Sequence, residues 1–340
     1  MRVTVAFVTP TASPFSHDSR LQPRFLTTAV GDATDAAAER AETVARLCAS
    51  AATLEPKHFY DRLGSHLFEA ITELDEYDPT RTEGAIFAAH AAEIAGACGT
   101  GMALVDLGAG NCAKAARLFP LLEPARYVAV DVSVGFLRDA LHDLQREHPR
   151  LPITGLGLDF SRRLTIPAEA IDGERPVFFY PGSSIGNFEP DDALAFLRRI
   201  RAEAAGGGLL IGIDLVKDPA RLLAAYDDAL GVTAAFNRNA LRVINRCIGS
   251  DFEPRDWRHV ALWNAELSRI EMHLEATRDV AVGWPDGGRR FAAGERIHTE
   301  SSCKWTVERF DALLREAGFG ATRSWTDERG WFAVFWAPAG

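Results

Sequence analysis

The middle of the chain alternates short apolar runs with segments in which apolar residues recur at helical spacing. Five apolar runs of strand length predict strands, at 104–107, 127–131, 153–158, 176–180 and 209–214. Helical spacing predicts helices from about 112, at 134–146 and at 190–204. This βαβ repetition predicts a parallel, doubly wound α/β sheet with right-handed crossovers.

The alternation stops after residue 214 and resumes near 303. Residues 218–248 have a mainly helical pattern, and 269–298 contain alternating runs that predict strands. A helix at 306–317 then precedes an antiparallel hairpin at 321–325 and 331–336. The sheet therefore carries an inserted α+β unit and closes with a reversed strand.

Before the first strand of the repetition, residues 34–54 and 66–73 have helical patterns. Pro79 interrupts any helix that would continue from there, and Thr82 is predicted to cap a third helix over 83–97. Residues 1–30 lack a clear period and are interpreted as a mobile arm. We therefore expect a sheet domain of 80–215 and 303–340, and a second domain of 31–79 and 216–302.

Composition excludes several classes of protein. The 340 residues are 47% hydrophobic and 25% charged, as expected for a globular protein with an ample core. The net charge of −10 without a basic stripe argues against a nucleic-acid partner. No apolar run approaches the length of a membrane span, and the first residues lack the features of a secretory signal, so we expect a cytoplasmic protein. We also expect a monomer.

Cysteine and histidine are arranged without the spacing of a disulfide framework or a metal site. The five cysteines form no CxxC pair, and the nine histidines lack ligand spacing. We therefore expect neither disulfides nor a metal.

A glycine loop, Gly108-Ala-Gly110, joins the first strand of the repetition to a helical pattern. Glycines can take positive φ and let a ligand approach the backbone. A strand, a glycine turn and a helix form the usual nucleotide site of an α/β sheet. On its own the loop also fits a nicotinamide dehydrogenase or a plain tight turn.

Acidic residues at successive strand ends favour S-adenosylmethionine. Asp106 can orient the ammonium of an amino-acid-bearing cofactor, and Asp131 can accept hydrogen bonds from ribose hydroxyls. Asp159 and Phe160 offer a polar acceptor and an aromatic plane for an adenine. The reversed last strand resembles that of class I methyltransferases, so we expect that Rossmann-like fold. As alternatives, Asp131 caps a helix and Phe160 belongs to the core.

Collinear motifs from about residue 56 to the C-terminus resemble the histidine Nα-methyltransferases of ergothioneine biosynthesis. The long polar string 231–239 is the most specific of them, and the first 50 residues are not covered. The other matching segments are 59–61, 76–83, 182–187, 214–218, 225–228, 270–272 and 299–304.

The resemblance implies transfer of three methyl groups from S-adenosylmethionine to the α-amine of free L-histidine, giving hercynine and S-adenosylhomocysteine. The implied cofactor-binding residues are Tyr60, Gly108, Gly110, Lys114, Asp131, Asp159 and Phe160. The implied substrate-binding residues are Tyr77, Gly182, Asn187, Tyr226, Met272, Glu300 and Ser302. The implied catalytic residues are Tyr60, Tyr77 and Asn187.

These residue types suit an in-line displacement in which positioning supplies most of the acceleration. The resemblance assigns the substrate carboxylate to Asn187 and Tyr226, and the imidazole to Glu300 and Ser302, with Met272 packed beside the ring. Tyr60 or Tyr77 can meet the growing cation with π-density.

Structural alternatives exist for several of these residues. Tyr226 and Met272 suit a core, and Asn187 suits a turn. Glu300 and Ser302, or Lys114, suit a solvated surface. One departure from the family is Asp78, which stands where other members have a second tyrosine. The negative charge of Asp78 either helps to bind a cation or is solvated.

Two functional alternatives also stay open. One is a related methyltransferase acting on tryptophan or a derivative of it. The other is a non-catalytic protein that binds S-adenosylmethionine.

Overall fold

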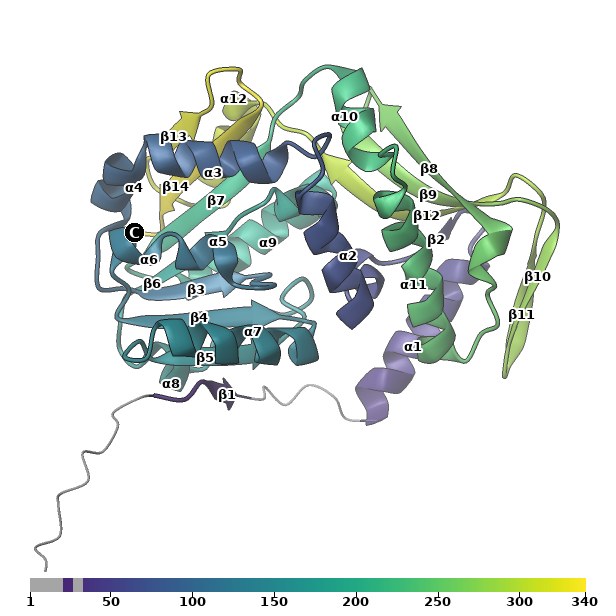
Figure 1. The fold of residues 1–340 in the computed structure, drawn as a ribbon, viewed down its shortest axis with the longest axis horizontal. Helices are drawn as coiled ribbons and strands as arrows, with labels where there is room; N and C mark the ends of the chain where they lie inside the picture. The colour runs from purple at the N-terminus through teal and green to yellow at the C-terminus, as the bar shows by residue number, and fades with distance from the viewer. Residues whose placement is uncertain (1–20, 27–32) are drawn as a thin grey trace, which may run out of the picture.

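An eight-stranded sheet organises most of the protein, of which the computed structural model describes residues 21–26 and 33–340 (Figure 1). Six strands run parallel, β14 runs antiparallel to its neighbour β7, and β13 pairs antiparallel with β14. In spatial order they are β1 (Arg24–Leu26), β5 (Ile153–Gly157), β4 (Arg126–Asp131), β3 (Ala103–Leu107), β6 (Pro176–Tyr180), β7 (Gly208–Asp214), β14 (Phe332–Pro338) and β13 (Arg323–Thr326). This topology confirms the predicted doubly wound sheet with its C-terminal hairpin.

Helices cover both faces of this sheet. Successive residues of β3 serve opposite faces, since Leu104 joins one apolar core and Val105 the other. One face carries α3 (Pro79–Ala89), α4 (Ala91–Cys98), α5 (Ala113–Ala116), α6 (Phe119–Leu122) and α7 (Val134–Glu147). The other carries α8 (Ala168–Ile171), α9 (Pro190–Glu203) and α12 (Val307–Glu316). Burial on both faces explains why these parallel strands are almost wholly apolar.

A smaller sheet lies beside the first (Figure 1), built from two distant parts of the sequence. Its strands are β2 (Ala52–Thr53), β12 (Arg296–Cys303), β9 (Arg269–Ala276) and β8 (Trp257–Asn264). The associated elements are α1 (Ala33–Cys48), η1 (Pro56–Phe59), α2 (Arg62–Thr72), α10 (Pro219–Tyr226), α11 (Val232–Ile248), η3 (Pro254–Asp256) and the hairpin β10 (Val280–Trp284) with β11 (Gly287–Phe291).

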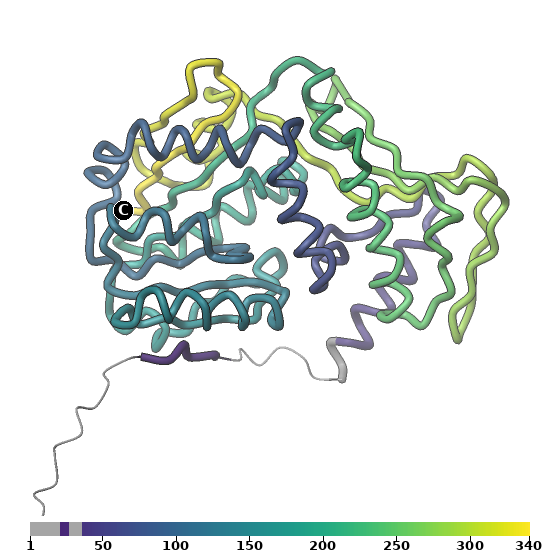
Figure 2. The backbone as a smooth tube through the Cα atoms, in the orientation of Figure 1, coloured from purple at the N-terminus to yellow at the C-terminus, as the bar shows by residue number. Residues whose placement is uncertain are grey.

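The purple α1 lies beside the green α11 in Figure 2, and α11 also packs against α2 and η1. Strand β2 pairs in parallel with β12, although the two are far apart in sequence. The segment before residue 80 and the inserted segment thus share one apolar core. The exact domain boundaries stay a prediction.

Several helix boundaries differ from the sequence expectation. The first helix ends at Cys48, not near 54. Helix α3 begins at Pro79, so the prediction that Thr82 caps it is wrong. Proline suits this first position because its missing N–H would have no partner in the first turn, and its φ is already helical. The predicted helix 83–97 is two helices, separated at His90.

Residues 24–26, for which the sequence predicted no element, add β1 to the edge of the sheet beside β5. Gly155 allows this approach, because a Cβ there would lie 2.9 Å from the ring of Phe25. Residues 1–20 and 27–32 of the predicted arm and its junction lie outside the described residues. Among the helices that are described, none has both the length and the apolar character needed to cross a membrane.

Candidate active site

A cavity lies where the loops after β6 and β7 meet β9 and β12 of the smaller sheet. Its wall contains every residue that was predicted to bind the substrate, together with one residue predicted to bind the cofactor. They are Tyr60, Tyr77, Gly182, Asn187, Tyr226, Met272, Glu300 and Ser302. Segments far apart in sequence therefore converge on one site.

Strand β12 supplies the acidic wall of the cavity. Glu300 is buried and lies opposite Met272 of β9, beyond an irregularity in the pairing at His298. Burial raises the pKa of the Glu300 carboxyl to about 7, although the Lys304 ammonium and a hydrogen bond with Asn187 oppose the rise. The solvated-face alternative for Glu300 is therefore wrong.

A polar cluster adjoins Glu300. The Tyr226 hydroxyl, at the end of α10, donates to the Ser302 hydroxyl oxygen at 2.7 Å. The Lys304 ammonium donates to both hydroxyl oxygens, at 3.0 and 2.9 Å, and pairs with the Asp214 carboxylate at 2.9 Å. Tyr226 is thus more than interior packing, and Ser302 does not lie on a solvated face.

Sequence reasoning did not single out Lys304 and Asp214 as site residues. The lysine could have been found from the alternation of side chains along a strand, because residues 300, 302 and 304 are expected on the same face. Both charged side chains are almost wholly buried. Asp214 lies at the end of β7, the strand edge at which α/β sheets place their functional groups.

Aromatic rings form the opposite wall. Tyr60, at the end of η1, meets Phe68 and Phe236 edge-on, with ring centroids 5.8 and 5.5 Å apart. Phe68 also meets Tyr77 edge-on at 6.3 Å. Burial raises the pKa of both tyrosines well above the ordinary value, so both phenols are neutral. The two phenylalanines were not predicted as site residues.

The turn after β6 adopts left-handed backbone at Gly182 and Ser183, with φ of 76° and 61°. It leads into η2 (Ser184–Asn187), which ends at Asn187. The Ser183 hydroxyl oxygen accepts a hydrogen bond from the Asp214 N–H at 2.8 Å. This turn therefore ties the loop after β6 to the end of β7, with Asn187 facing the cavity.

Five of the seven predicted cofactor residues lie at the carboxyl ends of β3, β4 and β5, whereas Tyr60 follows η1 and Lys114 lies in α5. Gly108 and Gly110 have positive φ, and Gly110 N–H donates to the Asp131 carboxylate at 2.9 Å. Asp131 also accepts from the Ser133 N–H. Phe160 lies 3.8 Å from where a Cβ of Gly108 would be. A Cβ at Gly108 would be in ordinary contact with this ring, so the glycine is required for its φ of 72° and not for space.

Asp106 has one carboxylate oxygen that accepts from the Tyr127 hydroxyl at 2.6 Å. Its other oxygen is buried and has no hydrogen-bond partner among the described residues. Burial raises the pKa of Asp106 to about 7. A buried acceptor without a partner, beside a glycine loop, fits a ligand that brings a cationic donor.

Lys114 lies between the cofactor loop and the cavity. Its ammonium pairs at 2.7 Å with Glu83, a buried carboxylate that also accepts from the Gly182 N–H at 2.8 Å. Lys114 is thus a partly exposed residue of α5 with a buried ionic partner, and its contact with the cofactor stays a prediction.

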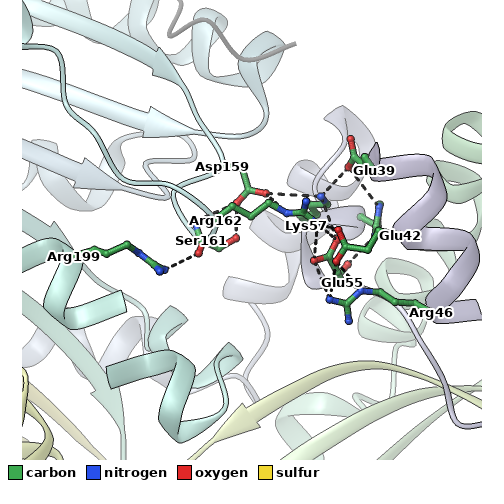
Figure 3. A network of polar contacts seen from close by, with 10 residues as sticks. Glu39, Glu42, Arg46, Glu55, Lys57, Asp159, Ser161, Arg162 and Arg199 are labelled. Atoms are coloured by element: carbon green, nitrogen blue, oxygen red, sulfur yellow. Dashed lines mark hydrogen bonds and ion pairs between the residues drawn. The ribbon is translucent and has the colours of Figure 1, made fainter. Parts of the chain in front are cut away.

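Asp159 belongs to a charged network that joins the loop after β5 to α1 and η1 (Figure 3). Its carboxylate lies 3.8 Å from the Lys57 ammonium and 3.6 Å from the Arg162 guanidinium. Arg162 also reaches Glu42 and Glu55. Asp159 thus lies at the contact between the loop after β5 of the main sheet and the elements α1 and η1, which pack with the smaller sheet.

Asp78 neither faces the cavity nor is solvated. It is buried and pairs with Lys217 at 2.7 Å and with Arg221 at 3.1 Å. Its negative charge is therefore matched within the protein.

One group of possible metal ligands occurs in the described residues, Glu39, His58 and Cys247, whose ligand atoms lie within 4.8 Å of one another. The Glu39 carboxylate already pairs with the Lys57 ammonium at 2.8 Å. We propose no metal site there, and the expectation of no metal stays a prediction.

Comparisons with known proteins bear on this site. Residues 39–339 match the family described as histidine-specific methyltransferase, SAM-dependent. The chain is 44% identical over 312 residues to histidine N-alpha-methyltransferase of Mycolicibacterium smegmatis, covering 89% of this chain and 96% of that protein. It is 33% identical over 277 residues to ergothioneine biosynthesis protein 1 of Neurospora crassa, covering 78% and 31%. It is 26% identical over 303 residues to 4-dimethylallyltryptophan N-methyltransferase of Trichophyton verrucosum, covering 84% and 88%.

Proposed function

The chain belongs to the histidine-specific, S-adenosylmethionine-dependent methyltransferases, and from this premise we propose that it methylates the α-amine of free L-histidine. Three successive transfers give the trimethylated product, hercynine. The observation that carries the proposal is a buried acid, Glu300, beside a hydroxyl cluster and opposite an aromatic wall in one cavity. An imidazole, a carboxylate and an amine find matching groups there.

We assign the imidazole to Glu300 and Ser302, with Met272 packed beside the ring. An ionised Glu300 accepts the ring N–H, and a substrate lacking that group leaves a buried acid without a partner. Such a mismatch costs on the order of 1–3 kcal/mol or more. We assign the carboxylate to Asn187 and Tyr226, next to the backbone of Gly182.

The reactive amine is assigned to the aromatic wall. Tyr60, Tyr77 and Asn187 align the amine lone pair with the methyl group, and no covalent enzyme intermediate is needed. Alignment supplies most of the acceleration. Because both phenols are neutral, their π-faces can meet a cation that grows with each methyl transfer.

The cofactor supplies an electrophilic methyl group on a sulfonium. We assign its binding to the predicted set, Tyr60, Gly108, Gly110, Lys114, Asp131, Asp159 and Phe160. The unpartnered oxygen of Asp106 fits the ammonium of its amino-acid part. We also propose that the protein acts as a cytoplasmic monomer and without a metal.

Product analysis tests the function. The protein, S-adenosylmethionine and a mixed amino-acid pool are incubated, and the products are identified by mass spectrometry. We expect trimethylated histidine and stoichiometric release of S-adenosylhomocysteine. The absence of turnover with every amino acid in the pool contradicts the proposal.

A second candidate substrate is tryptophan or a derivative, because one relative is named as a dimethylallyltryptophan N-methyltransferase. An indole offers one N–H and more bulk, so it leaves part of the Glu300 and Ser302 wall unmatched. Competition between histidine and tryptophan for turnover separates the two. Calorimetric binding of cofactor and histidine without turnover indicates a binding protein instead.

A further inference from the structure

Lys304 directly follows strand β12 and continues the face that carries Glu300 and Ser302. Its side chain is 1% exposed. An ammonium has three N–H donors, and each has a partner here: Asp214, Tyr226 and Ser302, at 2.9, 3.0 and 2.9 Å. Lys304 therefore has no donor left for a ligand, and it acts on a ligand through these neighbours and through its charge, which opposes the rise in the pKa of Glu300.

The contact with Lys304 determines whether the Ser302 hydroxyl acts as a donor or as an acceptor of hydrogen bonds. A hydroxyl has one proton and two acceptor lone pairs. An ammonium can only donate, so the Ser302 oxygen accepts from Lys304 whichever way the hydroxyl protons turn. It also accepts from the Tyr226 hydroxyl until Tyr226 turns its single proton to the substrate carboxylate. The Ser302 proton therefore points away from Lys304, which favours Ser302 as a donor toward a ligand. Glu300, once ionised, can act only as an acceptor.

We infer that Lys304 is a positioning residue that fixes Ser302 as a donor and thereby makes the cavity select a ring with one N–H and one acceptor nitrogen. A neutral imidazole has that pair, an indole has only the donor, and a thiophene has neither. This inference rests on the proposed function, because it assumes that the ring of the substrate lies against Glu300 and Ser302.

Lys217 provides a matched control. It is 4% exposed and pairs with the other oxygen of Asp214 at 2.7 Å and with Asp78 at 2.7 Å. No hydrogen bond joins it to Tyr226 or Ser302 in the described part of the chain. Removing either lysine takes one buried positive charge from Asp214, but only Lys304 touches the two hydroxyls, and its charge also lowers the pKa of Glu300.

The experiment compares Lys304→Met and Lys217→Met with the unmodified protein. Dissociation constants for L-histidine and for β-(2-thienyl)-L-alanine are measured by calorimetry on the complex with S-adenosylhomocysteine. The ratio of the two constants reports the discrimination between rings. Affinity for S-adenosylhomocysteine and the thermal midpoint report whether each variant is folded.

For Lys304→Met we expect the discrimination ratio to fall at least about tenfold, because Ser302 regains a free lone pair and loses its fixed orientation. We expect Lys217→Met to keep the ratio within about threefold of the unmodified protein, even if its thermal midpoint falls. An unchanged ratio in Lys304→Met, or an equal fall in both variants, overturns the inference.

Lys304→Gln replaces the methionine variant if that variant does not bind S-adenosylhomocysteine. The glutamine amide is one atom shorter and can reach one hydroxyl at most, so we expect the ratio to fall at least about threefold. An unchanged ratio in this folded variant is also contrary to the inference. Failure of the proposed function is recognised separately, because the unmodified protein then releases no S-adenosylhomocysteine with histidine.

Discussion

At the scale of single residues, Glu300 combines specificity with a cost in stability. Burial raises its pKa from 4.5 to about 7. The folded protein thus holds this proton more tightly than the unfolded chain does. Its favourable contribution is complete below pH 4.5 and is lost as the pH rises through about 7. The ionised form that can accept an imidazole N–H is therefore the form that destabilises the ligand-free protein.

Glu300→Gln is expected to stabilise the ligand-free protein at pH 8 by on the order of 1–3 kcal/mol, because the amide has no charge to bury. The gain should shrink as the pH falls toward 5, where Glu300 is already protonated. Denaturant unfolding of both proteins at the two pH values measures it. The pKa of Asp106 is also raised to about 7, but Asp106 is present in both proteins, so its contribution to the pH dependence cancels in the difference between their stabilities.

The same variant should lose histidine turnover by at least about a hundredfold, since a neutral amide is a poorer and less selective acceptor. Affinity for S-adenosylhomocysteine should change much less, because of the predicted cofactor residues only Tyr60 lines the same cavity as Glu300. A stability gain that is independent of pH, or an equal loss of cofactor affinity, would show that Glu300 has a different role.

Several polar residues of the cavity were accessible from the sequence, although Lys304 and Asp214 were not, whereas most of the apolar residues were missed. Glu300, Ser302 and Asn187 stood in polar strings that a family resemblance could identify. Phe68 and Phe236 line the same cavity, yet their spacing on helices is that of ordinary core residues. An apolar side chain looks the same in a pattern whether it packs in a core or lines a pocket.

At the scale of elements, the position of η2 depends on a close approach to β12. Gly186 of η2 makes this possible, because a Cβ there would lie 2.8 Å from the carbonyl oxygen of Cys303. Asn187 follows Gly186 directly, and Glu300 lies on the same strand as Cys303. The separation of η2 from β12 therefore sets the separation of Asn187 from Glu300.

Gly186→Ala should push η2 away from β12 and raise the KM for histidine by about tenfold or more, because misplacement by a fraction of an ångström impairs aligned groups. Gly135→Ala is the control, since a Cβ there meets nothing within 4 Å and the residue lies in helix α7. It should be neutral or stabilise by about 0.5–1 kcal/mol. Equal steady-state kinetics for the two variants would refute this account of η2.

The strands of the main sheet were predictable because burial on both faces leaves continuous apolar runs between turns. Breaks within helical segments were less predictable. The helix expected from 112 is two short helices, α5 and α6, with Pro120 in the first turn of the second. The kink between α3 and α4 at His90 has no proline or glycine at the break, so nothing local marked it.

At the scale of the molecule, ion pairs close to Asp159 link the loop after β5 of the main sheet to α1 and η1, which pack with the smaller sheet. Arg162, after β5, pairs with Glu42 of α1 at 2.6 Å and with Glu55 before η1 at 3.0 Å (Figure 3). These groups are partly exposed, so each pair contributes about 0–1 kcal/mol to stability. Their greater effect is to hold α1 and η1 against the loop that carries Asp159 and Phe160.

Arg162→Ala should therefore weaken S-adenosylhomocysteine binding by about threefold to tenfold at low salt while the thermal midpoint stays almost constant. Salt screens exposed pairs, so the difference from the unmodified protein should narrow at about 0.5 M salt. Calorimetry at two salt concentrations measures it. Arg146→Ala removes an exposed pair with Asp143 on α7 and should leave binding unchanged. A loss of affinity that is the same at both salt concentrations would exclude the ion-pair explanation.

The place of β14 in the sheet also governs how the chain can fold during synthesis. Strand β7 is wholly buried in the finished sheet, with β6 on one side and β14 on the other. A ribosome completes β7 at Asp214 but reaches β14 only at Phe332, after the whole insertion has emerged. Until then β7 is an apolar edge with unpaired backbone groups, the kind of edge that promotes aggregation. The nascent chain therefore passes through a long interval in which a chaperone that covers β7 would raise the yield of soluble protein.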